Sequence, residues 1–150
     1  MNWKTVVVVS SLATYLYLVI TEWVNLFPWN DVSTSTASQK LSGTLVNTVP
    51  FALLVAAFMA DRLWLKILAM GILLVMLGVH FAWWWVPYFW GASKAHLESY
   101  ARLFSQTYRF LPARGSNPVP DAHYVTYHVL VLADLFIAMV ALTSGQRARG

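Results

Sequence analysis

Four ionisable side chains interrupt long apolar stretches of this 150-residue chain: Glu22, His80, His128 and Asp134. An aspartate near the centre of a bilayer costs at least about 2.5 kcal/mol, so each of these groups needs a structural or functional reason. Histidine titrates near neutral pH, and burial tunes a glutamate toward the same range. Glu22 and His80 are therefore candidates for general acid and base, and the chemistry they predict is proton transfer within a membrane.

The composition favours a protein embedded in a bilayer. The chain is 59% hydrophobic and 11% charged, with a positive mean hydropathy, far outside the range of soluble domains. With 0 cysteines, disulfides, thiolate zinc sites, iron–sulfur ligation and covalent c-type haem are excluded. The formal net charge of +4 is spread along the chain, which favours basic residues flanking membrane spans and argues against nucleic acid as a partner.

Four stretches are long and apolar enough to cross about 30 Å of hydrocarbon as helices, namely residues 5–27, 44–60, 64–90 and 124–143. We expect the first to be a retained span, because no small-residue cleavage pattern follows it. Four spans bring both termini and the loop around Arg62 to one side. The basic residues of that side predict a cytoplasmic location: Lys4, Arg62, Lys66, Arg147 and Arg149. The expected fold is all-α, a four-helix bundle forming one domain (residues 1–150) in a plasma or inner membrane.

An additional helix is expected between the third and fourth spans, over about residues 94–110. In SKAHLESYARLFSQTYRFLP the apolar residues recur at helical spacing and the charged residues lie on the other face. Ser93 is a candidate N-cap and Pro112 a stop. This helix is amphipathic and too polar to span, so we expect it at the membrane interface or as a lid over the bundle.

Each span contributes one polar residue to a common depth in the outer half of the membrane. These residues are Glu22, Asn47, His80 and His128, each 14 to 17 residues from the cytoplasmic end of its span. In the fourth span, His128 and Asp134 lie about 120° apart around the helix, so they cannot both face the bundle axis.

The run WWWVPYFW is typical of an aromatic belt at the membrane surface. Six of the eight tryptophans fall at the outer end: Trp23, Trp29, Trp83, Trp84, Trp85 and Trp90. Consecutive helical residues point about 100° apart, so at least one member of the triplet must face a neighbouring helix. The alternative for Trp83 or Trp84 is the wall of a binding site, able to stabilise a cation through its ring face.

These observations lead to two hypotheses. In the first, the polar layer binds a lipophilic small molecule and transforms it by proton transfer, with Glu22 and His80 as catalytic residues. The residues expected to bind the molecule are Asn47, Trp83, Trp84, Tyr127, His128 and Asp134. In the second, the protein is a non-enzymatic subunit, assembly factor or resistance factor of a membrane complex, and the polar layer holds the helices together.

A metal site is the weaker form of the first hypothesis. Glu22, His80 and His128 make a two-histidine, one-carboxylate set, and the histidines alone are potential axial ligands of haem b. Paired His-x-x-x-His spacing is missing. The sequence therefore assigns no metal and identifies no cofactor, and whether the protein is an enzyme stays open. Besides lipid, the partners left open are a second copy of the chain and a larger membrane protein.

Overall fold

The protein folds as five helices. The computed structural model describes residues 2–147, with the side chains of residues 2–144. The helices are α1 (Trp3–Trp23), α2 (Ala37–Ala60), α3 (Leu63–Trp90), α4 (Lys94–Phe104) and α5 (Ala122–Arg147). The described part of the chain contains no strand. All the helices except α4 are long and apolar enough to cross a membrane, so the predicted all-α bundle with one additional helix is confirmed.

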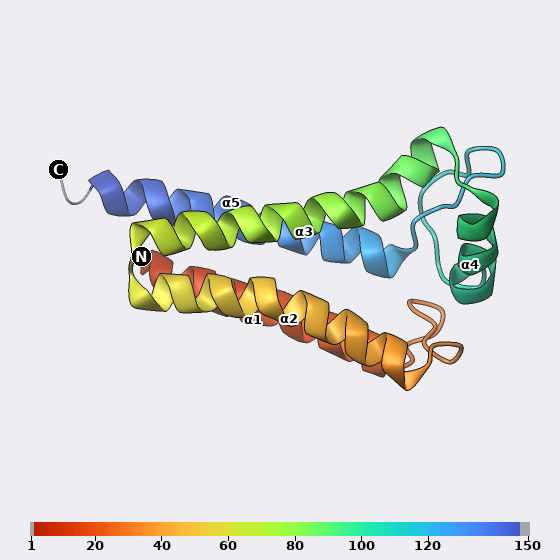
Figure 1. The fold of residues 1–150 in the computed structure, drawn as a ribbon, viewed down its shortest axis with the longest axis horizontal. Coiled ribbons are helices and arrows are strands. Elements are labelled where there is room, and N and C mark those ends of the chain that lie inside the picture. The colour runs from red at the N-terminus through yellow and green to blue at the C-terminus, as the bar shows by residue number, and fades with distance from the viewer. Residues whose placement is uncertain (1, 148–150) are drawn as a thin grey trace.

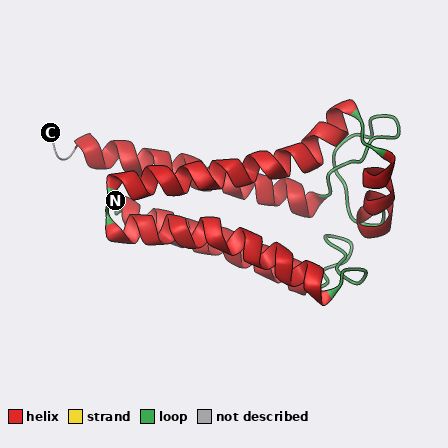
Figure 2. Ribbon diagram, viewed as in Figure 1, coloured by secondary structure: helices red, strands yellow, loops and turns green. Residues whose placement is uncertain are grey.

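The four long helices form a ring in which each packs against two others. The neighbours are α1 with α2, α2 with α3, α3 with α5, and α5 with α1. In Figure 1 both chain termini and the turn between α2 and α3 lie at one end, here called the terminal end, whereas α4 crosses the opposite end. The α1–α2 and α3–α5 pairs diverge toward this α4 end, where the longer loops also gather (Figure 2).

The end of α1 is set by a side chain seven residues beyond it. Asn30 is 3% exposed, and its amide nitrogen donates to the carbonyls of Thr21 and, at 3.0 Å, Val24. Its amide oxygen accepts from the backbone N–H of Leu26 at 2.7 Å. Because Asn30 takes up backbone groups that a continuing helix would use, α1 ends at Trp23 and not at the predicted residue 27.

The start of α2 is a capping box that places it before the predicted residue 44. Thr36 accepts from the N–H of Gln39 at 3.2 Å, and the Gln39 side chain accepts from the N–H of Thr36 at 2.9 Å. Since α2 therefore begins at Ala37, Pro50 lies in the helix interior and not in its first two turns, as the sequence suggested. The preceding turn is held by Asn47 and Thr48, whose side chains each donate to a carbonyl four residues earlier at 2.8 Å.

The additional helix is shorter than expected. Ser93 caps it as predicted, accepting from the N–H of His96 at 3.3 Å, but α4 ends at Phe104 and not near residue 110. Tyr108 leaves the helix because its backbone joins two other segments. Its N–H donates to Pro28 at 2.6 Å, and its carbonyl accepts from Ala122 at 2.8 Å. One residue thus fastens together the two loops of the α4 end and the start of α5.

The terminal end carries basic residues. Lys4 of α1 donates to the carbonyl of Met59 at 3.1 Å, and Lys66 of α3 pairs with Asp61 at 2.5 Å. Arg149 and the side chain of Arg147, which contributed to the predicted orientation, lie outside the described residues.

The role of Asn30 can be tested by removing its amide. We expect Asn30→Ala to lower the free energy of unfolding by about 2 kcal/mol, because buried backbone groups at the end of α1 lose their partners. The measurement is reversible denaturant unfolding in detergent. Asn25→Ala is the control, since Asn25 is exposed in the same segment and its loss should change stability by less than about 0.5 kcal/mol. Equal effects of the two substitutions would contradict this account of the helix end.

Candidate functional site

The three consecutive tryptophans of α3 face three different environments. Trp83 is 52% exposed and Trp84 only 3%. Trp85 is half-buried and turns toward α5. Their spacing of about 100° predicts this division, and the expectation that at least one faces a neighbouring helix is confirmed.

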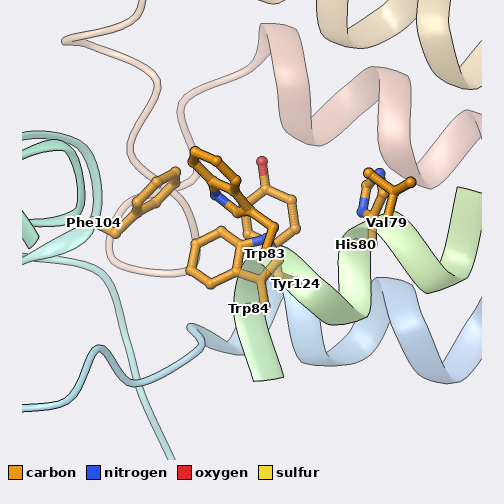
Figure 3. A pocket seen from close by; sticks show the side chains of 6 residues that line it. All are labelled: Val79, His80, Trp83, Trp84, Phe104 and Tyr124. Atoms are coloured by element: carbon orange, nitrogen blue, oxygen red, sulfur yellow. The ribbon is translucent and has the colours of Figure 1, made fainter. Parts of the chain in front are cut away.

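Between α3, α4 and the start of α5 lies a cleft of about 200 Å³, here called the aromatic cleft. It is lined by Val79, His80, Trp83, Trp84, Phe104 and Tyr124. Figure 3 shows the four larger aromatic side chains grouped together, with Val79 and His80 one turn earlier in α3. The ring of Trp84 lies 4.3 Å from that of Tyr124 and 4.8 Å from that of Phe104. The aromatic cleft is therefore mainly apolar, with an imidazole and a phenol as its polar groups.

Helix α4 covers one side of the aromatic cleft. The ring of His96 lies 4.6 Å from that of Trp83, and a smaller hollow of about 100 Å³ separates the rest of α4 from the tryptophans. Tyr100 fastens α4 to the segment that follows it, because its hydroxyl donates to Val119 at 2.9 Å and accepts from Arg109 at 2.9 Å. Helix α4 thus lies against the aromatic cleft, and whether it acts as a lid or as an interfacial helix stays a prediction.

His80 adjoins His128 of α5. Their ring centroids are 5.7 Å apart in an edge-on arrangement, and the Trp85 indole donates to His128 Nδ1 at 3.2 Å. Because Nδ1 accepts this bond, a neutral His128 carries its proton on Nε2. Among the described residues, neither His128 Nε2 nor His80 Nδ1 has a hydrogen-bond partner, although both atoms are buried. Both nitrogens are therefore available to bind a polar group or to exchange a proton.

Tyr127 connects the other members of the polar layer. Its hydroxyl donates to the Asn47 side chain of α2 at 2.8 Å, and its ring lies 5.5 Å from that of His80. Glu22 of α1 interacts electrostatically with Tyr127, and its carboxylate fits against Gly43, where a Cβ would lie 3.2 Å from Oε2. The structure thus brings residues of all four long helices to one level around Tyr127. That Glu22 and His80 act as catalytic residues stays a prediction.

Asp134 lies apart from this group. It is 1% exposed and its carboxyl faces the hydroxyls of Thr14 and Ser10 of α1, whereas His128 turns to α3. The angle of about 120° between the two positions therefore separates them onto different neighbours. Asp134 does not line the aromatic cleft, so its predicted contact with the same ligand gains no support from the geometry.

Sequence reasoning missed His123, which is 3% exposed. The Tyr17 hydroxyl of α1 donates to the His123 carbonyl at 3.2 Å and lies 3.2 Å from its Nδ1. The Trp29 indole donates to the same hydroxyl at 3.0 Å. The buried positions of α1 are Val7, Ser11, Thr14, Leu18 and Thr21. These positions follow one another at steps of four and three residues, which is one face of a helix. The same spacing in the sequence would have placed Tyr17 next to this buried face.

Asp121 positions the tyrosine of the aromatic cleft. It precedes α5, is 1% exposed, and accepts from the N–H of Tyr124 at 2.9 Å. Burial raises the pKa of Asp121 to about 6, against the opposing effects of the Tyr124 N–H, the Thr107 hydroxyl and the Arg109 charge. The carboxyl is therefore close to half-protonated near pH 6.

The described residues give no support for the metal alternative. Among them, no three histidine or acidic side chains are arranged to hold a metal ion together. Glu22, His80 and His128 approach the same region but do not form such a set.

Four apolar helices that are long enough to cross a bilayer, with a shared polar layer and one aromatic cleft beneath a short helix, define a small multi-pass helical membrane protein. No protein-family model, curated protein or solved structure matches this chain.

The shifted pKa of Asp121 predicts a pH dependence of stability. The folded-state pKa of about 6 exceeds the ordinary value of 3.8, so the folded protein keeps a proton that the unfolded chain loses. This group's contribution is fully present below pH 3.8 and is lost as the pH rises to about 6. The difference corresponds to about 3 kcal/mol.

We therefore expect Asp121→Asn, which keeps an acceptor for the Tyr124 N–H, to gain about 3 kcal/mol relative to wild type between pH 3 and pH 7. Denaturant unfolding of both proteins in detergent across this range is the measurement. A stability difference that does not change with pH would show that Asp121 titrates normally.

Proposed function

We propose that the protein binds a lipid-soluble molecule with a small planar polar head in the aromatic cleft. The observation that carries this proposal is the buried His80 Nδ1, which has no partner among the described residues and belongs to a side chain that lines a mainly apolar cleft. A buried nitrogen without a partner costs about 1 to 3 kcal/mol, so a ligand group that hydrogen-bonds to it gains affinity and direction.

The size of the aromatic cleft limits the part of the ligand that enters it. Its volume of about 200 Å³ is smaller than that of ordinary small-molecule sites, which span roughly 300 to 1,000 Å³. Val79 and Trp83 at its edge are 63% and 52% exposed, on the surface that faces lipid in a membrane. We therefore expect one ring to enter beside Trp84 and Phe104, and an apolar tail to extend among the acyl chains.

The chemistry proposed for this site is proton exchange with an oxygen of the head group. His80 is the immediate acid or base, because it lines the aromatic cleft and its ring adjoins those of His128 and Tyr127. Glu22 interacts electrostatically with Tyr127 and supplies a second acidic group to the layer. A hydroquinone fits these requirements, since it combines a planar ring, hydroxyl groups that exchange a proton without a change of oxidation state, and an apolar tail. The corresponding quinone keeps the ring and the hydrogen-bonding oxygens, so it can report binding.

Ubiquinone-1 is a suitable probe, because its short tail keeps it soluble. We expect it to raise the melting temperature of the detergent-purified protein in a saturable manner. His80→Leu should weaken binding about tenfold, the equivalent of one hydrogen bond. Trp90→Leu is the control: Trp90 is 75% exposed and lies outside the lining of the aromatic cleft, so its replacement should leave the dissociation constant unchanged.

Binding that His80→Leu leaves intact would overturn the proposed site. If ubiquinone-1 does not bind and the protein instead copurifies with a larger membrane protein in fixed stoichiometry, the non-enzymatic alternative is supported.

We also propose that the terminal end lies in the cytoplasm, because Lys4, Arg62 and Lys66 gather there within short connections. Because the chain contains 0 cysteines, single-cysteine labelling tests this orientation directly. In intact cells, a membrane-impermeant maleimide should label the exposed positions Thr34→Cys and Ser116→Cys, and should label Arg62→Cys only after permeabilisation. The wild-type chain is the unlabelled control, and the reverse pattern would invert the orientation.

A further inference from the structure

The geometry points to a second site, buried between α1 and α5 at mid-bundle, that binds a monovalent cation. Its ligands are the Asp134 carboxylate and the hydroxyls of Ser10, Ser11 and Thr14. The inference goes beyond the proposed function, because none of these residues lines the aromatic cleft.

The four residues occupy one level of the bundle. Asp134 lies 12 residues from the start of α5, and Ser11 lies 12 residues from the end of α1. Both are therefore about 18 Å from the α4 end, close to the middle of a hydrocarbon layer about 30 Å thick. Here a charge has no water to stabilise it, so an ionised Asp134 requires a counter-charge within the site.

The site contains oxygen atoms whose bonding capacity is not used. Asp134 is 1% exposed, Ser11 0% and Thr14 3%. The hydroxyls of Thr14 and Ser10 face the Asp134 carboxyl, and that of Ser10 donates to the Val7 carbonyl at 3.1 Å, yet Asp134 Oδ2 and Ser11 Oγ are buried without a partner among the described residues. Two unpartnered oxygens in one polar cluster are costly unless something binds them.

The surroundings close the site to water. Val7 and Leu18 lie one turn before and after the hydroxyl residues on α1, and Val131 and Ala138 do the same for Asp134 on α5; all four are 0% or 1% exposed. The polar cluster is therefore surrounded by apolar side chains. An ion bound there would be coordinated directly by the side-chain oxygens.

The charge and the ligand type select the occupant. One carboxylate balances one positive charge, whereas a divalent ion would leave an uncompensated charge in the bilayer. Carboxylate and hydroxyl oxygens are hard ligands that suit alkali and alkaline-earth ions and not the softer transition metals. A monovalent alkali ion therefore fits best, and Na⁺ is the probe for the test.

The test is the melting temperature of the detergent-purified full chain as NaCl replaces choline chloride at constant ionic strength. We expect a saturable rise, reaching about 5 °C when Na⁺ is in hundredfold excess over its dissociation constant. Choline is the ionic-strength control, because it is too large for the site. Equal melting temperatures in Na⁺, K⁺ and choline would overturn the inference and leave Asp134 as a protonated structural carboxyl.

Substitutions show which residues the rise of the melting temperature in Na⁺ depends on. Asp134→Asn keeps the size of the side chain and its capacity to bond Thr14 but removes the charge, so it should abolish the Na⁺ response. Asp31→Asn, in the exposed loop, should retain it. Ser11→Ala is a milder change that should weaken Na⁺ binding about tenfold, and equilibrium binding of ²²Na⁺ to wild type gives a direct measure that does not depend on a variant folding.

A Na⁺ response that survives Asp134→Asn would overturn the assignment of this site. His80→Leu separates this inference from the proposed function, because it should weaken ubiquinone-1 binding while leaving the Na⁺ response unchanged.

Discussion

The structure depends on one constraint, the need to pair polar groups away from water. In hydrocarbon an unpaired polar group costs several kcal/mol, so polar side chains in apolar helices must find one another. Tyr127 meets this need by reaching from α5 to Asn47 of α2, two helices that are not neighbours in the ring. Because this bond crosses the bundle, it fixes the relative heights of the helices and places His80 and Glu22 around the same phenol.

The α4 end differs in character from the rest of the bundle. The helix pairs diverge there, and contacts between loops replace contacts between long helices (Figure 1). The Tyr108 backbone joins Pro28 to Ala122, and Tyr100 holds α4 against the following segment. The aromatic cleft thus lies where the bundle is open, and its covering helix is positioned by hydrogen bonds outside the membrane-spanning helices.

Helix α5 separates two kinds of polar chemistry. Its His128 turns to α3, where the Trp85 indole fixes the proton position of the ring, whereas Asp134 turns to the hydroxyls of α1. The imidazoles adjoin the aromatic cleft, and the carboxyl is enclosed by apolar layers. The proposed ligand site and the proposed cation site therefore lie on different faces of the same helix.

Composition and hydrophobic run length were sufficient to predict the four long helices, and residue spacing predicted the separate directions of the three tryptophans and of His128 and Asp134. These features follow from helical geometry, which acts over a few residues. The length of α4 and the partners of Tyr17 required the fold, because Tyr108 and His123 act through bonds to segments distant in the chain. The end of α1 required the conformation of the following loop, which folds Asn30 back onto the last turn of the helix. The sequence determined which residues are polar within the helices, and the tertiary structure decided which of them meet, since pairing depends on rotations and heights that no single helix specifies.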